Sequence, residues 1–430
     1  MVIRIEESEW ARCVAALTRR QDVESAAVWL AEGIPGDVLV VRHLHVFEDE
    51  DYLVREVDQI ALNPVSLNRA IRRGREAGWS VITVHTHPQS SVPWFSQADD
   101  HGDARLMPAL HHQMDGPHGS VVIAADSGVP LARVFPAPDS PPVHASIVVV
   151  GDRIRRYPGE SGEAPADERF NRQELGLGAI GQSCLRRSHV AVVGLGGTGS
   201  VVACQLGHLG VGRLTLMDGD RLEASNLSRV VGARRSDVGV PKVDVAARYL
   251  AESGLPASVD VLLQNLSPEN AHRLAGCDLV VSCVDRETPR AILNRAAYAW
   301  ALPVVDIGTA FRAGSVDGGR AAGRLVVVGP GRPCLACWGH LDPDALRWEA
   351  LSETERDECR EDGYVTGARV PEPSVISFNS QVASAAVTEV LRAIAGFGNA
   401  GPHRLAFDFD SGVVRRNTVR RRPCAICGAP

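Results

Sequence analysis

A glycine-rich turn in the middle of the chain restricts its possible folds more than any other feature. Residues 194–200 read GLGGTGS and follow a short apolar run at residues 190–193. Glycines let a backbone approach a phosphate closely, and the free N–H groups at the start of the following helix attract its charge. Beyond the turn, short apolar runs alternate with helical stretches, so the sequence predicts an α/β fold with a mainly parallel sheet.

A second motif, earlier in the chain, has the residue types of a hydrolytic metal site. His85 and His87 follow an apolar run at residues 81–84, and Asp99 comes after them. Alternate residues of a strand point to the same side, so the two imidazoles can share a cation. Two histidines and one carboxylate leave the fourth position of a tetrahedral zinc open for water, which is typical of a catalytic site.

Two more residues complete the expected hydrolytic chemistry. A carboxylate near this zinc would take a proton from the water and deliver it to a leaving amine; Glu24 is the candidate, and Glu32 competes with it. Ser96 would donate a hydrogen bond to the carbonyl oxygen of the substrate as its carbon becomes tetrahedral.

Length and composition indicate a globular protein with more than one domain. The chain has 430 residues, which exceeds one ordinary core. Residues 151–168 are rich in glycine, proline and charge, so we expect a linker there. It separates residues 1–150, expected to form a small α+β or three-layer α/β domain, from residues 169–430, which carry the glycine turn.

Charge and hydropathy exclude several classes of partner. The net charge of -7 is spread along the chain without a long basic block, so we expect no nucleic acid. The arginines at residues 415–422 fit a solvated strand end better than a docking site. The start has no apolar signal region, and no run reaches the roughly 18 apolar residues of a membrane span. We therefore expect a cytoplasmic protein that does not enter a membrane.

Four of the ten cysteines form two pairs, Cys334-x-x-Cys337 and Cys424-x-x-Cys427. In a reducing compartment such pairs favour a closed structural zinc site, with disulfides as the alternative. The pairs lie farther apart than those of an ordinary zinc finger. The cysteines at positions 184, 204, 277 and 283 lie among apolar residues and are expected to fill the core.

Residues 10–135 resemble the JAMM/MPN family of zinc isopeptidases. The resemblance rests on Glu24, followed by HTHPQSSVPWFSQAD at residues 85–99, although the loop before Ser96 is about one residue longer than in the family. It implies zinc held by His85, His87 and Asp99, with Glu24 and Ser96 as catalytic residues.

From Arg169 onward the chain resembles the MoeB/ThiF/HesA family of ubiquitin-activating-like enzymes, which adenylate the carboxy terminus of a ubiquitin-like protein. The residues that carry this resemblance are Arg169-Phe170-Asn171-Arg172-Gln173, the glycine turn, Asp218-x-Asp220, Ser225-Asn226-Leu227-x-Arg229, Gly239-x-Pro241-Lys242 and Ser282-Cys283-Val284-Asp285. The residues expected to bind ATP are Gly194, Gly196, Gly197, Gly199, Asp218, Asp220, Asn226, Arg229, Lys242 and Asp285.

The chemistry of adenylation accounts for these residue types. Asp218 ends the second strand, where it can hold ribose hydroxyls. Arg229 and Lys242 would neutralise phosphate oxygens while a carboxylate attacks the α-phosphate, and Asp285 would hold Mg²⁺ on the leaving pyrophosphate.

The second resemblance has three further implications. The arginine that matches Arg172 reaches into the nucleotide site of a partner subunit, so we expect a homodimer. The family joins its carboxy-terminal tail to the nucleotide domain through a split zinc site, which favours zinc at the two cysteine pairs. Cys359 lies where the family often carries the thiol that accepts the modifier; it is a candidate catalytic residue, with a bystander thiol as the alternative.

Together the motifs predict a bifunctional enzyme. Its second domain would adenylate the terminal glycine of a ubiquitin-like protein with ATP and Mg²⁺ and pass it to Cys359 or to a conjugating enzyme, while the JAMM domain would process the precursor or cleave conjugates. One alternative is activation of a ThiS/MoaD-like sulfur carrier, with release of a product by the JAMM domain. Others are adenylation of a peptide or small molecule in natural-product biosynthesis, and a catalytically silent scaffold. Fold analogy carries part of this prediction.

Overall fold

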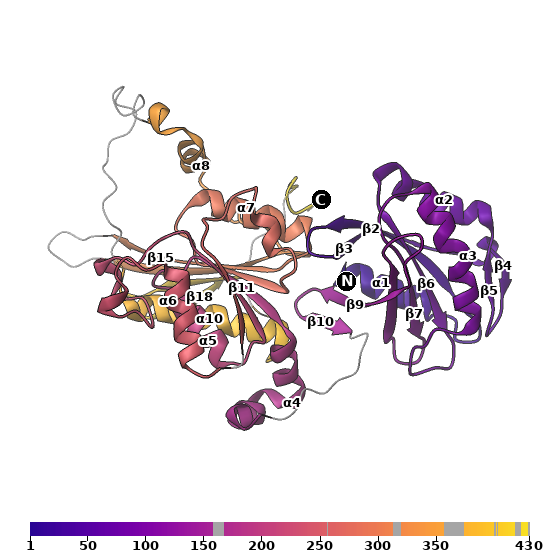
Figure 1. Cartoon of the computed structure of the whole chain (residues 1–430), viewed down its shortest axis with the longest axis horizontal. Helices are drawn as coiled ribbons and strands as arrows, with labels where there is room; N and C mark the ends of the chain where they lie inside the picture. Colours follow the sequence, from indigo (N-terminus) through magenta and orange to yellow (C-terminus); the bar gives the residue numbers. More distant parts are fainter. Residues whose placement is uncertain are drawn as a thin grey trace. The chain divides into compact units, whose positions relative to one another are not determined.

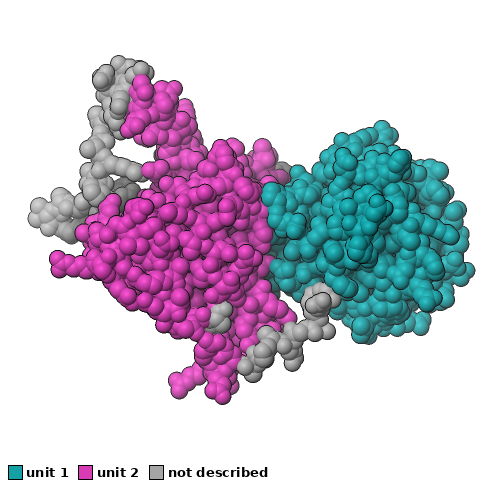
Figure 2. Space-filling view, viewed as in Figure 1, with its two compact units in different colours: residues 1–163 teal, residues 164–430 magenta. Residues whose placement is uncertain are grey.

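The chain folds into two compact units, Met1–Glu163 and Ala164–Pro430 (Figure 2). The computed structural model describes residues 1–157, 167–255, 257–312, 320–356, 374–399, 401, 403–417 and 423–428. No helix among these residues is long and apolar enough to cross a membrane.

The first unit is built on one mixed sheet with the strand order β1-β3-β2-β6-β7-β8-β9-β10 (Figure 1). Its strands are β1 (Val2–Glu6), β2 (Ala26–Ile34), β3 (Val38–Val46), β6 (Ser80–His87), β7 (His118–Ala124), β8 (Pro130–Phe135), β9 (Val143–Val150) and β10 (Ile154–Tyr157). Because β1 also pairs with β9, the sheet curls until the two strands meet, and β10 extends beyond them. A separate hairpin of β4 (Tyr52–Arg55) and β5 (Ile60–Leu62) precedes α2.

Helices cover both faces of this sheet. On one face, α1 (Glu7–Leu17) packs Trp10 and Leu17 into a core with Trp29 of β2. On the other face, α2 (Pro64–Ala77) and α3 (Gln97–Gln113) share a core with Val28 of β2. Adjacent residues of β2 thus enter different cores, as the two-residue period of a strand requires. The result is a three-layer α/β unit, one of the two forms that the sequence predicted.

The expected linker at 151–168 begins too early. Residues 154–157 form β10, which pairs antiparallel with β9, so residues 151–157 make a hairpin of the first unit. Residues 154–157, IRRY, do not alternate between apolar and polar side chains. A strand at the edge of the sheet does not need this pattern, and Arg155 of β10 is exposed there. Its pairing therefore depends on a neighbouring strand that the local sequence does not reveal.

The second unit contains a sheet with the strand order β13-β12-β11-β14-β15-β16-β17-β18. The first five strands in this order are parallel: β13 (Ser258–Leu262), β12 (Arg213–Met217), β11 (His189–Val193), β14 (Leu279–Ser282) and β15 (Val304–Arg312). The remaining strands are antiparallel: β16 (Arg320–Val328), β17 (Arg404–Asp408) and β18 (Val413–Asn417). The parallel part has the 3-2-1-4-5 order of a Rossmann sheet, in which ligands bind where the direction of winding reverses, here between β11 and β14.

Helices lie on both faces of the second sheet as well. α5 (Gly199–His208) packs against α6 (Lys242–Glu252) and α10 (Ile376–Val390), whereas α7 (Glu287–Ala299) packs against α8 (Pro343–Ala350) (Figure 1). α10 continues directly into a π-helical turn, Leu391–Ala395. α4 (Asn171–Arg187) precedes β11 and is interrupted at Gly178, whose φ is 74°. This arrangement confirms the predicted α/β class and puts the glycine turn at the reversal point.

Candidate functional site

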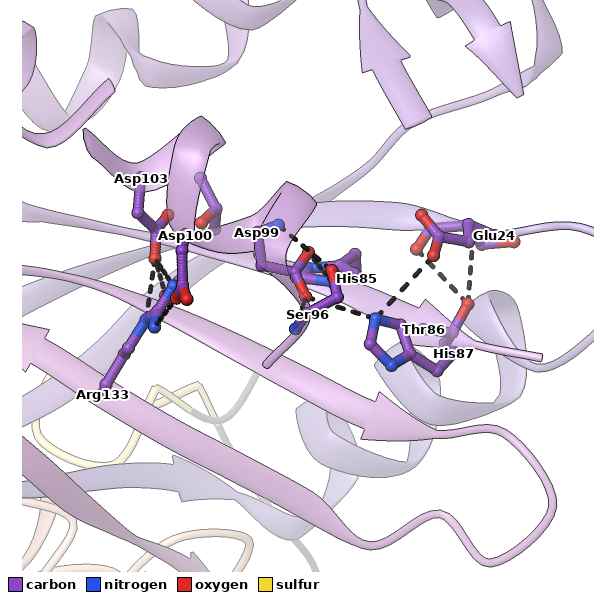
Figure 3. Close-up of polar contacts among 12 residues, drawn as sticks. Glu24, His85, Thr86, His87, Ser96, Asp99, Asp100, Asp103 and Arg133 are labelled. Atoms are coloured by element: carbon purple, nitrogen blue, oxygen red, sulfur yellow. Dashed lines mark hydrogen bonds and ion pairs between the residues drawn. The ribbon is translucent and has the colours of Figure 1, made fainter. Parts of the chain in front are cut away.

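The two histidines and the aspartate of the first unit converge on one point. β6 runs between β2 and β7 and ends at His87, so His85 and His87 lie on one side of a strand that is held on both edges. His85 Nε2 lies 2.8 Å from one oxygen of Asp99, and His87 Nε2 lies 3.4 Å from the other (Figure 3). The structure thus brings these three side chains together, and their role as metal ligands stays a prediction.

Asp99 reaches the histidines because it sits in the first turn of α3. Ser96 is the N-cap of this helix: its hydroxyl oxygen accepts a hydrogen bond from Asp99 N at 3.2 Å, and Asp99 Oδ2 accepts one from Ser96 N at 2.6 Å. Burial opposes ionisation of the Asp99 carboxyl, but the adjacent His85 and His87 imidazoles, with the hydrogen bond from Ser96 N, outweigh it and hold its pKa well below the usual range. Asp99 is therefore an anion, as a metal ligand must be.

The side-chain atoms of this cluster lie close enough together to share one metal ion. One ligand atom from each of His85, His87 and Asp99 lies within 4.8 Å of the others. His85 Nε2 is buried and, despite its 2.8 Å approach to Asp99, has no hydrogen-bond partner of acceptable geometry. Buried polar groups without partners are rare in native proteins, and a cation bound between these atoms would satisfy them.

Glu24 lies next to these ligands. It lies two residues before β2, and its Oε1 is 3.8 Å from His87 Nε2. Burial raises the pKa of the Glu24 carboxyl to about 7, a value suited to a group that gains and loses a proton near neutral pH. The competing acid, Glu32, lies farther along β2, is half-exposed and is paired with Arg42 at 2.7 Å. The structure therefore brings Glu24, and not Glu32, to the cluster.

The neighbourhood contains residues that the sequence motif did not include. The ring of Trp94 lies 4.6 Å from that of His87 and is half-exposed. Asp103 and Arg133 form a buried ion pair on the side of α3 that faces β7 and β8. Asp103 is four residues after Asp99, a spacing that could have indicated the same helix face, but Arg133 reaches it only through the pairing of β8 with β7.

In the second unit, the glycine turn lies at the rim of an open cavity of about 1540 Å³. Gly194 has a φ of 87°, and a Cβ there would come within 2.7 Å of Cys283 O, so both backbone conformation and space require glycine. Gly196 and Gly197 also line the cavity, and Gly199 is the first residue of α5. The turn thus has the backbone exposure and the helix start that a phosphate requires.

Asp218 fixes the shape of this turn. It follows β12, and its two oxygens accept hydrogen bonds from Leu195 N at 2.6 Å and from Asp220 N at 2.8 Å. The side chain is largely buried, and this burial raises its pKa. Each carboxylate oxygen has a second lone pair, so Asp218 can hold the turn and still accept hydrogen bonds from a ligand.

The remaining predicted polar residues line the same cavity: Asp220, Asn226, Arg229, Lys242 and Asp285. Lys242 Nζ pairs with Asp220 Oδ2 at 2.8 Å, and an Arg229 guanidinium nitrogen donates to Ser225 O. Arg172 is different: it is exposed on α4 and is not among the residues of this chain that line the cavity. The structure therefore brings together every predicted nucleotide-binding residue except Gly199, which does not line the cavity.

Sequence reasoning missed a charged group beside this cavity. Its central carboxylate, Asp306, does not line the cavity, but the partners Arg290 and Arg324 do. Asp306 of β15 is fully buried, accepts a hydrogen bond from Ser282, and lies 3.2 Å from Arg324 and 3.5 Å from Arg290. These residues come from β14, β15, β16 and α7, so only the register of the sheet brings them together. The cavity thus extends beyond the nucleotide motif toward the antiparallel half of the sheet.

The two cysteine pairs form one cluster. Sulfur–sulfur distances are 3.6 Å for Cys334–Cys337, 3.7 Å for Cys334–Cys424 and 3.7 Å for Cys337–Cys427. Four thiolates at about 2.3 Å from a tetrahedral zinc would lie about 3.8 Å apart, whereas a disulfide requires about 2.0 Å. The arrangement therefore fits a structural zinc, and all four cysteines are free. Cys359 lies outside the described residues.

The second unit has the sheet order, the phosphate-binding type of turn and the carboxylate after β12 that define the Rossmann-like α/β class. The profile of the ThiF family matches residues 170–426, which is more than half of the chain. The chain therefore belongs to the ThiF family.

Named relatives agree with this family. The sulfur carrier protein adenylyltransferase of Thermus thermophilus is 34% identical over 268 residues, which cover 61% of this chain and 90% of that protein. The molybdopterin-synthase adenylyltransferase of Escherichia coli is 30% identical over 269 residues, covering 60% of this chain and 96% of that protein. The adenylyltransferase and sulfurtransferase uba4 of Pyricularia oryzae is 34% identical over 182 residues, but the match covers 40% of this chain and only 35% of uba4.

The fold also resembles a solved structure. The crystal structure of Escherichia coli MccB with AMPCPP and MccA superposes with a TM-score of 0.51 at 21% identity, covering 63% of this chain and 77% of that chain. At this identity the likeness concerns the fold alone.

Proposed function

We propose that the second unit adenylates the carboxy-terminal glycine of a ubiquitin-fold carrier protein with ATP. A carboxylate oxygen of the carrier attacks the α-phosphorus, a P–O bond to the β-phosphate breaks, and pyrophosphate leaves. The observation that carries the proposal is the convergence of the glycine turn, Asp218, Arg229, Lys242 and Asp285 on one cavity. Membership of the ThiF family supports it.

The residues of this cavity divide the work of the reaction. The turn holds phosphate through its N–H groups, and Asp218 accepts hydrogen bonds from the ribose. Lys242 lies 2.8 Å from Asp220 before ATP binds and exchanges this partner for the phosphates. Lys242 and Arg229 together neutralise the charge that develops on the phosphates. Asp285, which lines the cavity, would hold Mg²⁺, and the ion when bound would neutralise part of the charge of the pyrophosphate.

Among possible carriers, a sulfur carrier of the ThiS/MoaD type is favoured. Two relatives that align over nine-tenths or more of their length are named for sulfur carrier protein and for molybdopterin synthase. Transfer to Cys359 or to a conjugating enzyme remains part of the hypothesis for a conjugated modifier. A thiocarboxylate on the carrier, detected by mass spectrometry, would identify the sulfur-carrier function; an isopeptide conjugate would identify the other.

We also propose that the enzyme is a homodimer in which Arg172 completes the nucleotide site of the partner. In its own chain Arg172 is exposed outside the cavity, and two apolar side chains of the same helix, Leu175 and Ile180, are 89% and 82% exposed. Contact with a second copy would cover such side chains.

For the first unit we propose a JAMM-type zinc peptidase that acts on the carrier, its precursor or its products. Its support is the convergence of His85, His87 and Asp99 around an unpartnered buried nitrogen, with Glu24 adjacent. When bound, zinc would supply an acidified water and polarise the scissile carbonyl. Glu24 would move the proton to the leaving amine, and Ser96 would donate a hydrogen bond to the oxyanion.

The decisive experiment for the second unit is ATP–pyrophosphate exchange with and without a carrier that ends in glycine. Exchange that depends on the terminal glycine supports the proposal. Exchange without any protein partner would favour adenylation of a small molecule, and no exchange with any candidate would favour a scaffold. Arg229→Ala should abolish exchange, whereas Arg221→Ala, on an exposed arginine bonded to Gly239 O, is the matched control.

A further inference from the structure

A buried charged cluster lies one helical turn beyond the proposed zinc ligand Asp99. Asp103 of α3 accepts a hydrogen bond from Ser120 Oγ of β7 and one of 2.9 Å from Arg133 Nε of β8. A second guanidinium nitrogen of Arg133 lies 2.7 Å from the same carboxylate oxygen (Figure 3). The side chains of Asp103 and Arg133 are only 10% and 12% exposed. Three separate elements therefore meet at one carboxylate.

Arg133 contacts the segment that carries Ser96 and Asp99 from both sides. Its guanidinium carbon lies 3.9 Å above the ring centre of Phe95, the residue that precedes the N-cap. Another of its nitrogens lies 2.6 Å from Asp100, the residue that follows the metal ligand. Because the Asp100 side chain is 59% exposed, solvent screens its contact with Arg133, so the packing of Arg133 against Phe95 and its pairing with the buried Asp103 are the contacts that hold the first turn of α3.

The same cluster connects this turn to the strand that carries the histidines. Ser120 is the register partner of Thr83 in the parallel pairing of β6 and β7, two residues before His85. Asp103 follows Asp99 by one turn of α3, so movement at either position is transmitted along a rigid helix. Asp103 thereby links the helix with one ligand to the sheet with the other two.

A buried ion pair is a weak source of stability, because desolvation of both charges offsets most of their attraction. What the pair does provide is fixed geometry, since the guanidinium fork binds a carboxylate in a defined plane. Metal affinity depends on such outer contacts, because they hold the ligands in place before the metal binds.

We propose that Asp103, Ser120 and Arg133 are positioning residues that hold Asp99 and Ser96 at the His85–His87 pair and so preorganise the metal site. This inference rests on the proposed function of the first unit. It assigns a role to residues that touch neither the metal nor the substrate.

The test is equilibrium binding of Zn²⁺ and Co²⁺ alone to the full chain, in competition with a chromophoric chelator. Co²⁺ at the cysteine cluster gives thiolate charge-transfer absorption, whereas the nitrogen and oxygen site gives only ligand-field bands, so the two sites are read separately. Asp103→Asn keeps the size and the acceptor oxygen but removes the charge. We expect it to weaken metal binding at the His85–His87 site about 10-fold to 100-fold and to change the ligand-field spectrum.

Asp100→Asn is the matched control, because it makes the same chemical change at the exposed partner of the same arginine. Its side chain is 59% exposed, so we expect less than a twofold change in metal affinity. Ser120→Ala removes only the hydroxyl and replaces Asp103→Asn as the test variant if the latter does not fold. Weaker metal binding by Ser120→Ala supports the proposal, and unchanged metal binding overturns the proposal.

Two other outcomes also overturn the proposal. One is a folded Asp103→Asn protein with the metal affinity and spectrum of the parent. The other is an equal loss in Asp100→Asn, which would reflect a general charge effect. If instead the proposed metal site of the first unit is wrong, the result differs from both of these outcomes. The parent protein would then bind metal at the His85–His87 site no better than the His85→Ala variant does.

Discussion

Replacement of Gly196 by alanine tests whether the glycine turn binds phosphate. A Cβ at Gly196 would meet no protein atom within 4 Å, and the backbone there has no left-handed conformation that alanine would strain. Gly196 nevertheless lines the large cavity. The added methyl group would therefore occupy space that the protein leaves free, which is where we place a phosphate of ATP.

The expected effects on folding and on binding differ. Replacement of glycine by alanine at an unstrained position stabilises a protein by about 0.4–1 kcal/mol, because it restricts the unfolded chain. A methyl group that keeps a phosphate from one backbone N–H removes a charge-assisted hydrogen bond worth about 1.5–3 kcal/mol. At 1.36 kcal/mol per factor of ten, ATP should bind about 10-fold to 150-fold more weakly.

Isothermal titration calorimetry with ATP and thermal unfolding measure the two effects. Gly276→Ala is the matched control: its Cβ also meets no atom within 4 Å, but Gly276 does not line the cavity. The control should bind ATP like the parent. A folded Gly196→Ala protein whose ATP affinity stays within twofold of the control would refute the assignment of the phosphate to this turn.

Three further predictions concern other parts of the chain. Glu24→Gln should keep zinc at the His85–His87 site, by metal analysis, but slow hydrolysis of a carrier precursor about 10²-fold to 10⁴-fold, because the amide cannot carry the proton; unimpaired hydrolysis would exclude Glu24 as the base. Cys427→Ser should lose one zinc per chain and unfold at a lower temperature, and an unchanged zinc content would contradict the four-cysteine site. Burial lowers the pKa of His118 to about 4, so its contribution to stability is complete above about pH 6.5 and declines as the pH falls toward 4, by up to about 1.4 kcal/mol per pH unit. His118→Gln should show a shallower decline in urea unfolding over this range, and equal slopes would refute this cause.

Features encoded by neighbouring residues could be predicted from the sequence. The glycines of the turn indicate its backbone conformation, since Gly194 adopts a φ that favours glycine. The apolar run before the turn predicts a buried strand. The two-residue spacing of His85 and His87 likewise fixes their common side once a strand is assumed. In these cases the physical cause lies within a few residues of the effect.

Features that depend on sheet register could not be predicted. Arg133 approaches Asp103 only because β8 pairs with β7, and Arg324 approaches Asp306 only because β16 pairs antiparallel with β15. Neither arginine differs from a surface arginine in its local sequence. A single chain gives no signal for such pairings, so the charged groups that support each site were absent from the prediction.

The Ser-x-x-Asp motif is ambiguous for a different reason, because the same spacing is the ordinary capping box of a helix. In the structure, Ser96 and Asp99 form a capping box, and the same Asp99 also lies next to His85. Ser96 Oγ accepts a hydrogen bond from Asp99 N, which leaves the hydroxyl hydrogen free to donate elsewhere. The Oδ2 atom of Asp99 accepts a hydrogen bond from Ser96 N, whereas Oδ1 of the same carboxylate lies 2.8 Å from His85 Nε2. The cap therefore does not compete with the proposed chemistry, because it leaves the Ser96 hydroxyl hydrogen free to donate and one carboxylate oxygen of Asp99 next to His85.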